Sequence, residues 1–282
     1  MKPAVIGLVD WRTPVKGADA VRLAAQLGAE GIQLDLGGPD RAPWLDSKAR
    51  LRAVCDALAD TGVTPLAVSA NLLNDIGITA EKGTPAAKQV ECVIRRALDA
   101  AMVIGAKLVF LPSFRCSAIE NPAALARTAD VLHWACSEAK ARGLLLGTEN
   151  VLPPDRLQQL ISAVKSPDLR VVLDTGNPLR VGMSPCDVVQ AATPVLANQV
   201  HIKGIDEKKT LSNNEAVIVN TLHELCRRDI PVTAFVLEND YRDGLTGRLK
   251  ADLIWLRHHI KKYWGFHPLT DGSVTQATLL SE

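Results

Sequence analysis

Two kinds of hydrophobic pattern alternate along the chain. Short runs of apolar, often β-branched residues predict strands, and longer stretches with apolar residues every three or four positions predict amphipathic helices. The predicted strands are residues 4–10, 31–36, 65–70, 108–112, 144–149, 170–174, 200–204 and 233–238. The predicted helices are residues 18–27, 48–59, 86–104, 123–141, 155–164, 186–197, 215–228 and 248–263.

Strands that alternate with helices indicate a parallel sheet. Several predicted strands are apolar almost throughout, as expected for strands covered on both faces. Eight units in 282 residues average about 35 residues each, a length typical of a (β/α)8 barrel. A doubly wound open sheet is the competing fold, but the Gly-rich turn expected after its first strand is absent. We therefore predict one TIM barrel over residues 1–266, followed by a polar C-terminal tail, 267–282, that is extended or disordered.

Four successive predicted strands carry a potential metal ligand near their C-terminal ends. These residues are Glu149, Asp174, His201 and Glu238, at separations of 25, 27 and 37 residues. Active sites of TIM barrels lie at this end of the strands, so the four side chains can converge. One such residue alone is more simply explained as a helix cap or a solvated loop residue. Four in succession favour a site for one divalent ion, Mn2+, Mg2+, Co2+ or Zn2+.

Charge and composition exclude several classes of protein. The 32 basic and 31 acidic residues nearly cancel, which gives no general attraction to nucleic acid or to acidic membranes. No apolar run approaches the ~20 residues of a membrane span, and the apolar start of the chain is too short for a signal peptide. The six cysteines form no C-x-x-C pair. We therefore expect a cytoplasmic protein with reduced thiols.

The four strand ends resemble those of the xylose isomerase-like TIM barrel superfamily, in its sugar and sugar phosphate isomerase and epimerase branch. The resemblance spans about residues 3–265. It is most specific in the segments Thr148-Glu149-Asn150, Leu173-Asp174-Thr175-Gly176-Asn177, Val200-His201-Ile202-Lys203 and Leu237-Glu238-Asn239. In that family the corresponding glutamate, aspartate, histidine and glutamate bind one divalent metal. The resemblance thus implies the same role for Glu149, Asp174, His201 and Glu238.

The resemblance also implies a mechanism and a class of substrate. Glu149 and Glu238 would be the catalytic residues, on opposite sides of a bound sugar or sugar-derived acid. They would transfer a proton through a metal-bound enediolate. Return of the proton on the opposite face gives epimerisation, and return to the adjacent carbon gives isomerisation. A lyase, either a dehydratase or a decarboxylase, can use the same intermediate. The expected partner is a small carbohydrate, and such barrels are often homo-oligomers.

Other positions are candidates for substrate binding. Ketose 3-epimerases of the family usually carry a histidine at position 177 and an arginine at position 207, where this chain has Asn177 and Glu207. A ketohexose 3-epimerase is therefore not favoured. Asp155 is a candidate second acidic contact, and Lys203 can hold an oxyanion or carboxylate, or else be a solvated lysine.

Three more candidates lie near the ends of the first, second and fourth predicted strands. Trp11 can form an apolar wall of the site or pack in the core. Asp35 is at a position where the family often has an acidic substrate contact. Arg115 can bind the carboxylate or phosphate of an acidic sugar, or form a surface ion pair.

Two further functions compete with an isomerase or epimerase. A relative that cuts DNA at abasic sites would need a three-metal cluster with many more histidine and acidic ligands, and a basic surface that the net charge does not indicate. A non-catalytic subunit that only binds sugar is disfavoured by the intact set of four ligands. The sequence leaves the identity of the substrate open.

Overall fold

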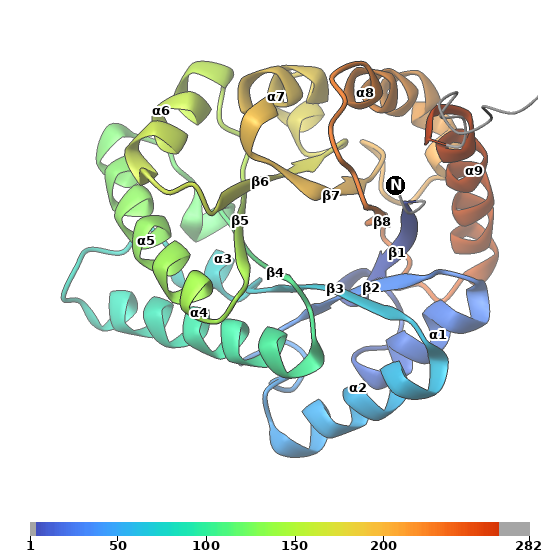
Figure 1. Ribbon diagram of the computed structural model, residues 1–282, viewed down its shortest axis with the longest axis horizontal. Coiled ribbons are helices and arrows are strands. Elements are labelled where there is room, and N and C mark those ends of the chain that lie inside the picture. The colour runs from blue at the N-terminus through green and yellow to red at the C-terminus, as the bar shows by residue number, and fades with distance from the viewer. Residues whose placement is uncertain (1–3, 265–282) are drawn as a thin grey trace, which may run out of the picture.

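Eight parallel strands close into a barrel in the computed structural model, which describes residues 4–264 (Figure 1). Each strand pairs with its neighbours in the chain, and β8 pairs with β1 to close the ring. The predicted (β/α)8 barrel is confirmed. The predicted tail, 267–282, lies outside the described residues, so the domain boundary stays a prediction. The strands are β1 (Val5–Val9), β2 (Gly31–Asp35), β3 (Thr64–Ser69), β4 (Leu108–Pro112), β5 (Leu145–Glu149), β6 (Leu169–Asp174), β7 (Leu196–Ile202) and β8 (Ala234–Leu237).

Helices surround the barrel on its outer side (Figure 1). They are α1 (Ala18–Leu27), α2 (Lys48–Thr61), α3 (Leu73–Ile76), α4 (Pro85–Ile104), α5 (Pro122–Ala141), α6 (Pro154–Val164), α7 (Pro185–Ala192), α8 (Glu215–Arg227) and α9 (Thr246–Trp264). The short helix α3 was not predicted and differs from the others, because it lies at the C-terminal mouth of the barrel, directly after β3. Among the described helices, none combines the length and apolar character that crossing a membrane would require.

The start of β7 differs from the prediction. The sequence pattern extends the preceding helix to residue 197, but α7 ends at Ala192 and the strand begins at Leu196. Pro194 lies between them in a single 3-10 turn. Proline cannot donate the backbone hydrogen bond that a continuing helix needs. The chain therefore leaves the helix there, and Leu196 pairs with Val171 of β6.

Local sequence signals explain where helices begin and end, and α4 is an example. The side chain of Thr84 accepts a hydrogen bond from the backbone N–H of Ala87, and Pro85 follows at the first helical position. Both are typical of a helix start. At the other end Gly105 has a φ of 82°, a left-handed conformation that glycine adopts without steric cost.

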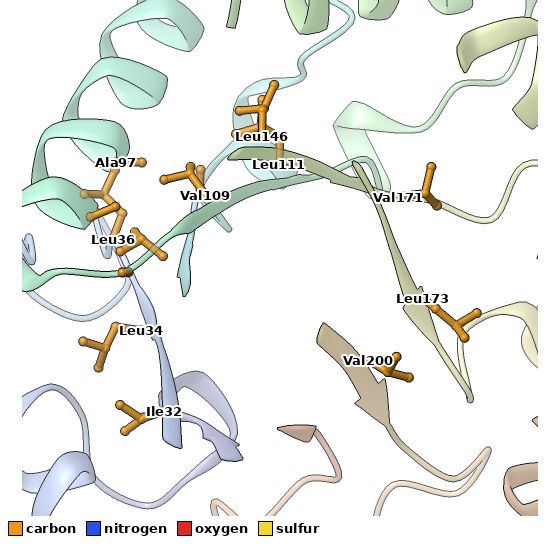
Figure 2. Close-up of a cluster of buried hydrophobic side chains, with 14 of the residues drawn as sticks. Ile32, Leu34, Leu36, Ala97, Val109, Leu111, Leu146, Val171, Leu173 and Val200 are labelled. Atoms are coloured by element: carbon orange, nitrogen blue, oxygen red, sulfur yellow. The ribbon is translucent and has the colours of Figure 1, made fainter. Parts of the chain in front are cut away.

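Side chains alternate between the two faces of each strand, and this alternation separates the core from the site. One set points outward and packs under the helices, as Ile32, Leu34, Val171 and Leu173 do in Figure 2. The other set points into the barrel, where small apolar clusters fill the interior around Phe110 and beneath the mouth. Polar residues at the ends of the inward-facing set therefore meet over the filled interior.

Two glycines make room for a leucine at the bottom of the barrel interior. A Cβ atom added to Gly31 would lie 2.7 Å from Leu66 Cδ1, and one added to Gly7 would lie 2.6 Å from the same atom. Neighbouring strands β1, β2 and β3 thus pack around one side chain, and any larger residue at either glycine must displace it.

We predict that Gly31→Ala lowers the free energy of unfolding by about 1–3 kcal/mol, because the added methyl overpacks the interior. Urea denaturation measures this loss. Gly247→Ala is the matched control, since its added methyl meets no atom within 4 Å, and it should be neutral or slightly stabilising. In a protein that already carries Leu66→Ala, adding Gly31→Ala should lower the free energy of unfolding by much less than it does in the unaltered protein. Simple additivity of the two losses would contradict this account.

Candidate active site

Four ionisable side chains converge at the C-terminal end of the barrel. Glu149 ends β5, Asp174 ends β6, His201 lies near the end of β7, and Glu238 directly follows β8. Each belongs to the inward-facing set of its strand, and all four are buried. One ligand atom from each lies within 4.8 Å of the others. The convergence expected from the spacing is thus present in the fold.

The orientation of the His201 ring is determined by a chain of buried hydrogen bonds. Gln199 Nε2 donates to the backbone oxygen of Leu66 at 2.8 Å, and Gln33 Nε2 donates to Gln199 Oε1 at 2.9 Å. The next contact joins His201 Nε2 to Gln33 Oε1 at 2.8 Å. A backbone oxygen can only accept, so the direction of every bond in the chain is set, and His201 Nε2 must be the donor. His201 Nδ1 is therefore the ring nitrogen that faces the carboxylates.

His201 Nδ1 lies 3.3 Å from Glu238 Oε2 and 3.6 Å from Glu149 Oε2. Burial alone would lower the pKa of His201, but attraction by Glu238 and Glu149 outweighs it and raises the pKa to about 10. In the ion-free protein this imidazole is positively charged and partly balances the carboxylates. A metal ion would take over that role and would require the ring to lose the Nδ1 proton.

Two buried atoms point to a cation site. Within residues 4–264, neither His201 Nδ1 nor Asp174 Oδ2 makes a hydrogen bond, and their contacts are the ion pairs of Nδ1 with the two glutamates and of Oδ2 with Lys203 Nζ. The other oxygen, Asp174 Oδ1, accepts from the backbone N–H groups of Gly176 and Asn177, which fixes the orientation of the carboxylate. Buried polar atoms without partners are rare in folded proteins and call for an explanation. Three carboxylates and an imidazole suit Mn2+, Mg2+, Co2+ or Zn2+, so the group could bind one such ion.

The two glutamates have matching environments. Glu149 Oε1 accepts a hydrogen bond from Asn177 Nδ2 at 2.7 Å, and Glu238 Oε1 accepts one from Trp11 Nε1 at 2.8 Å. Both donors are neutral and both line the cavity above the site. In each glutamate, therefore, one oxygen faces His201 while the other is held by a neutral donor at the cavity wall.

A buried lysine provides a second positive charge. Lys203 Nζ lies 3.0 Å from Glu238 Oε2 and 3.3 Å from Asp174 Oδ2. Burial disfavours the ammonium, but attraction by Asp174 and Glu238 raises the pKa of Lys203 above its ordinary value. Burial raises the pKa of Asp174 to about 7 despite this lysine, whereas Lys203 and His201 together hold the pKa of Glu238 well below its usual range against the effect of burial. Lys203 is thus a charged member of the site and not a solvated surface lysine.

A cavity of about 540 Å3 opens above the four residues. Its floor is polar, and five arginines lie around it, Arg12, Arg41, Arg115, Arg180 and Arg242. Segments after all eight strands contribute to its lining, so the cavity lies at the mouth of the barrel, where TIM barrels carry out their chemistry.

Comparison with known proteins agrees with this geometry. The sequence profile of the xylose isomerase-like TIM barrel family matches residues 21–229. The chain belongs to this family. The resemblance inferred from the four strand ends is therefore confirmed.

One curated member of the family is 46% identical over 259 residues, which cover 89% of this chain and 93% of its own length. It is 2-epi-5-epi-valiolone 7-phosphate 2-epimerase from Actinoplanes sp.. Among solved structures, an L-ribulose 3-epimerase has a TM-score of 0.74 at 17% identity and covers 92% of this chain and 95% of that one. The IOLI protein, crystallised with a zinc atom, has a TM-score of 0.72 at 15% identity, with coverage of 93% and 100%. The two solved structures share the fold, and the relative that is 46% identical supports an enzyme, specifically a sugar epimerase.

The structure of this family member brings most of the other predicted residues to the cavity. Trp11, Arg115, Asn177 and Lys203 line it, and their roles toward a substrate stay predictions. Asp155 does not reach it, because this residue is exposed in the first turn of α6 and is absent from the lining.

Asp35 is also absent from the cavity lining and is buried. Its Oδ1 atom accepts a hydrogen bond from the backbone of Asn71, and its own N–H donates to Asp10 Oδ1. Burial, with repulsion from Asp10, raises the pKa of Asp35 to about 6. These contacts assign Asp35 a role in fixing the loops after β1, β2 and β3.

Several residues of the site were not predicted from the sequence. Gln33 was visible as a polar residue inside an apolar strand run, a recognisable signal for a buried hydrogen bond. Glu207 was noted only as a departure from ketose 3-epimerases. Its carboxylate binds Arg12 at 3.0 Å and Arg180 at 2.5 Å. That bridge joins loops far apart in the chain, and no local pattern reveals it.

We predict that Gln33→Leu weakens binding of a divalent ion by about 10- to 100-fold, because loss of the acceptor for His201 Nε2 frees the ring and its tautomer. Competition with a fluorescent chelator measures the affinity. Gln26→Leu, on the exposed side of α1, is the control and should bind the ion like the unaltered protein. Unchanged affinity in a folded Gln33→Leu variant would show that the hydrogen-bond chain does not orient the ligand.

Proposed function

We propose that this chain is a divalent-metal-dependent epimerase that inverts the carbon next to a carbonyl group in a phosphorylated sugar or cyclitol. The observation that carries the proposal is the buried group of Glu149, Asp174, His201 and Glu238, in which two ligand atoms make no hydrogen bond. The relative that is 46% identical, an epimerase of a 7-phosphorylated valiolone, supports the choice of reaction and substrate class.

All four residues are proposed metal ligands, and two of them, the glutamates, also transfer the proton. A divalent ion held by them would polarise the substrate carbonyl and acidify the neighbouring C–H bond. Asp174 and His201 serve only as ligands. Backbone N–H groups hold the second oxygen of Asp174, and Gln33 holds the second ring nitrogen of His201, so neither atom is free to act on the substrate. Glu149 and Glu238 each retain an oxygen at the cavity wall, and these two oxygens exchange the proton with the substrate.

Inversion follows from the placement of the two glutamates at opposite ends of the arc formed by β5, β6, β7 and β8. One carboxylate removes the proton from one face of the carbon, and the other returns a proton to the opposite face. Asn177 and Trp11 orient the two reacting oxygens by the hydrogen bonds that they donate. The Lys203 ammonium, between Asp174 and Glu238, offsets the negative charge that develops on the substrate.

The remaining assignments extend the same proposal. The partner is a small carbohydrate, and the enzyme acts in carbohydrate metabolism in the cytoplasm. Manganese is one of the four candidate metals, and add-back of each to chelated enzyme identifies the one used. A homo-oligomer stays a prediction.

We expect the protein to convert 2-epi-5-epi-valiolone 7-phosphate to its 2-epimer and, in D2O, to place deuterium at the inverted carbon, because the returned proton comes from solvent. Proton NMR follows both changes. EDTA should abolish turnover and one added metal should restore it. Loss of water from this substrate would instead indicate a lyase of the dehydratase type, and full activity after exhaustive chelation would contradict the proposed site.

Glu149→Gln and Glu238→Gln should each lower kcat by about 10²- to 10⁴-fold, since an amide cannot take up the proton. Metal content is measured on the same samples, so that loss of the ion is separated from loss of the base. Glu91→Gln, on the exposed side of α4, is the control for the substitution. If both variants retained the ion and full kcat, proton transfer by these glutamates would be refuted.

A further inference from the structure

The metal-ligand group occupies only half of the barrel mouth. All four ligands come from β5–β8, whereas the cavity extends over the loops that follow β1–β4 as well. A substrate that presents its carbonyl and neighbouring hydroxyl to the four ligands must therefore place its other carbons over the second half. This step rests on the proposed function, since it takes the reacting carbons to lie beside Glu149 and Glu238.

Two arginines lie in this second half of the cavity, and a single carboxylate holds both. Arg41 follows β2 and donates through Nε and Nη2 to Asp75 Oδ2, at 2.9 and 2.6 Å. Arg115 follows β4, and its Nη2 lies 2.6 Å from Asp75 Oδ1. The three residues carry a net charge of +1. Each guanidinium uses only part of its N–H donors on Asp75, and the others are available to an anion.

The segment that carries Arg115 is held rigidly. Arg115 has a φ of 51°, a conformation that residues other than glycine seldom adopt. The flanking contacts maintain it, because the backbone N–H of Phe114 donates to Asn74 Oδ1 at 2.8 Å and Ser117 Oγ donates to the backbone oxygen of Leu73 at 2.6 Å. These bonds tie the segment to α3, on which Asp75 lies, so the arginine and its carboxylate are positioned together.

The other arginine pair in the cavity, Arg12 and Arg180, is placed differently. The carboxylate that it shares, Glu207, lies 3.9 Å from Lys203 Nζ and is nearly buried. This pair therefore belongs to the charge network of the metal-ligand group, at the reacting end of the substrate. Among the described residues, Arg41 and Arg115 make no ion pair with that network, and the carboxylate between them is exposed.

We propose that Arg41 and Arg115, held by Asp75, form the subsite for the phosphate monoester group of the substrate. A phosphate dianion matches the planar donors of two guanidinium groups, each able to donate two parallel hydrogen bonds. Since the anion sits across the mouth from the reacting carbon, the subsite selects phosphorylated substrates without contacting the groups that transfer the proton.

The kinetic test compares 2-epi-5-epi-valiolone 7-phosphate with its dephosphorylated form. Arg41→Gln and Arg115→Gln should each raise KM for the phosphorylated substrate by about 10- to 100-fold, the range expected for loss of a charge-assisted contact, and leave kcat and the weaker turnover of the dephosphorylated form unchanged. Asp75→Asn should raise the same KM less. Arg22→Gln, in an exposed ion pair on α1, is the control. Equal losses for both substrates, or loss of phosphate preference in Arg180→Gln instead, would overturn the proposal.

A second measurement does not depend on turnover. Calorimetric titration with inorganic phosphate should show binding to the unaltered protein and at least about tenfold weaker binding to the folded double variant Arg41→Gln/Arg115→Gln. Phosphate binding that survives the double substitution would refute the subsite. If the unaltered protein bound phosphate through these arginines but epimerised neither substrate, the proposed reaction would fail and the anion subsite would stand.

Discussion

Three carboxylates are buried within a few ångströms of one another, and the mouth of the barrel is built around the cost of holding them there. Isolated buried charges are strongly unfavourable, and like charges add repulsion. In the ion-free protein His201 and Lys203 supply the compensating charge, and backbone N–H groups, Asn177 and Trp11 supply hydrogen bonds. These two positive charges offset much of the negative charge of the three carboxylates. A bound ion would take the place of the Nδ1 proton of the imidazole, and Lys203 would remain as the second positive charge beside Glu238.

The positions of these charged and polar side chains follow from the alternation of side chains along each strand. His201, Gln199 and Lys203 are separated by two residues each, so all three point into the barrel at successive heights. Gln199, the lowest of the three, donates to a backbone oxygen and accepts from Gln33. The orientation of Gln33 is therefore set, and its free oxygen accepts the hydrogen bond from His201. The upper one, Lys203, faces the carboxylates. One strand therefore supplies the support, the ligand and the counter-charge.

The fold and the metal-ligand group could be predicted from the sequence because both depend on regular spacing. Repeated strand–helix units indicate a closed barrel, and polar residues that end successive strands must meet at its mouth. Contacts between loops have no such period. The bridge from Arg12 and Arg180 to Glu207, and the pairing of Arg41 with Asp75, join segments whose proximity only the folded chain determines. Asp155 was predicted at the site because of its short distance from Glu149 in the sequence, but the start of α6 carries it to the surface.

The Glu207 bridge has a mechanical consequence. It joins the loop after β7 to the loops after β1 and β6, so displacing any one of these three loops must break an ion pair or move a second loop with it. Asp75, which joins the loops after β2 and β4, is more exposed than Glu207, so its ion pairs compete more strongly with water. The two arginines proposed to bind the phosphate therefore lie on the more exposed side of the mouth, where a charged group can reach them before it is fully desolvated.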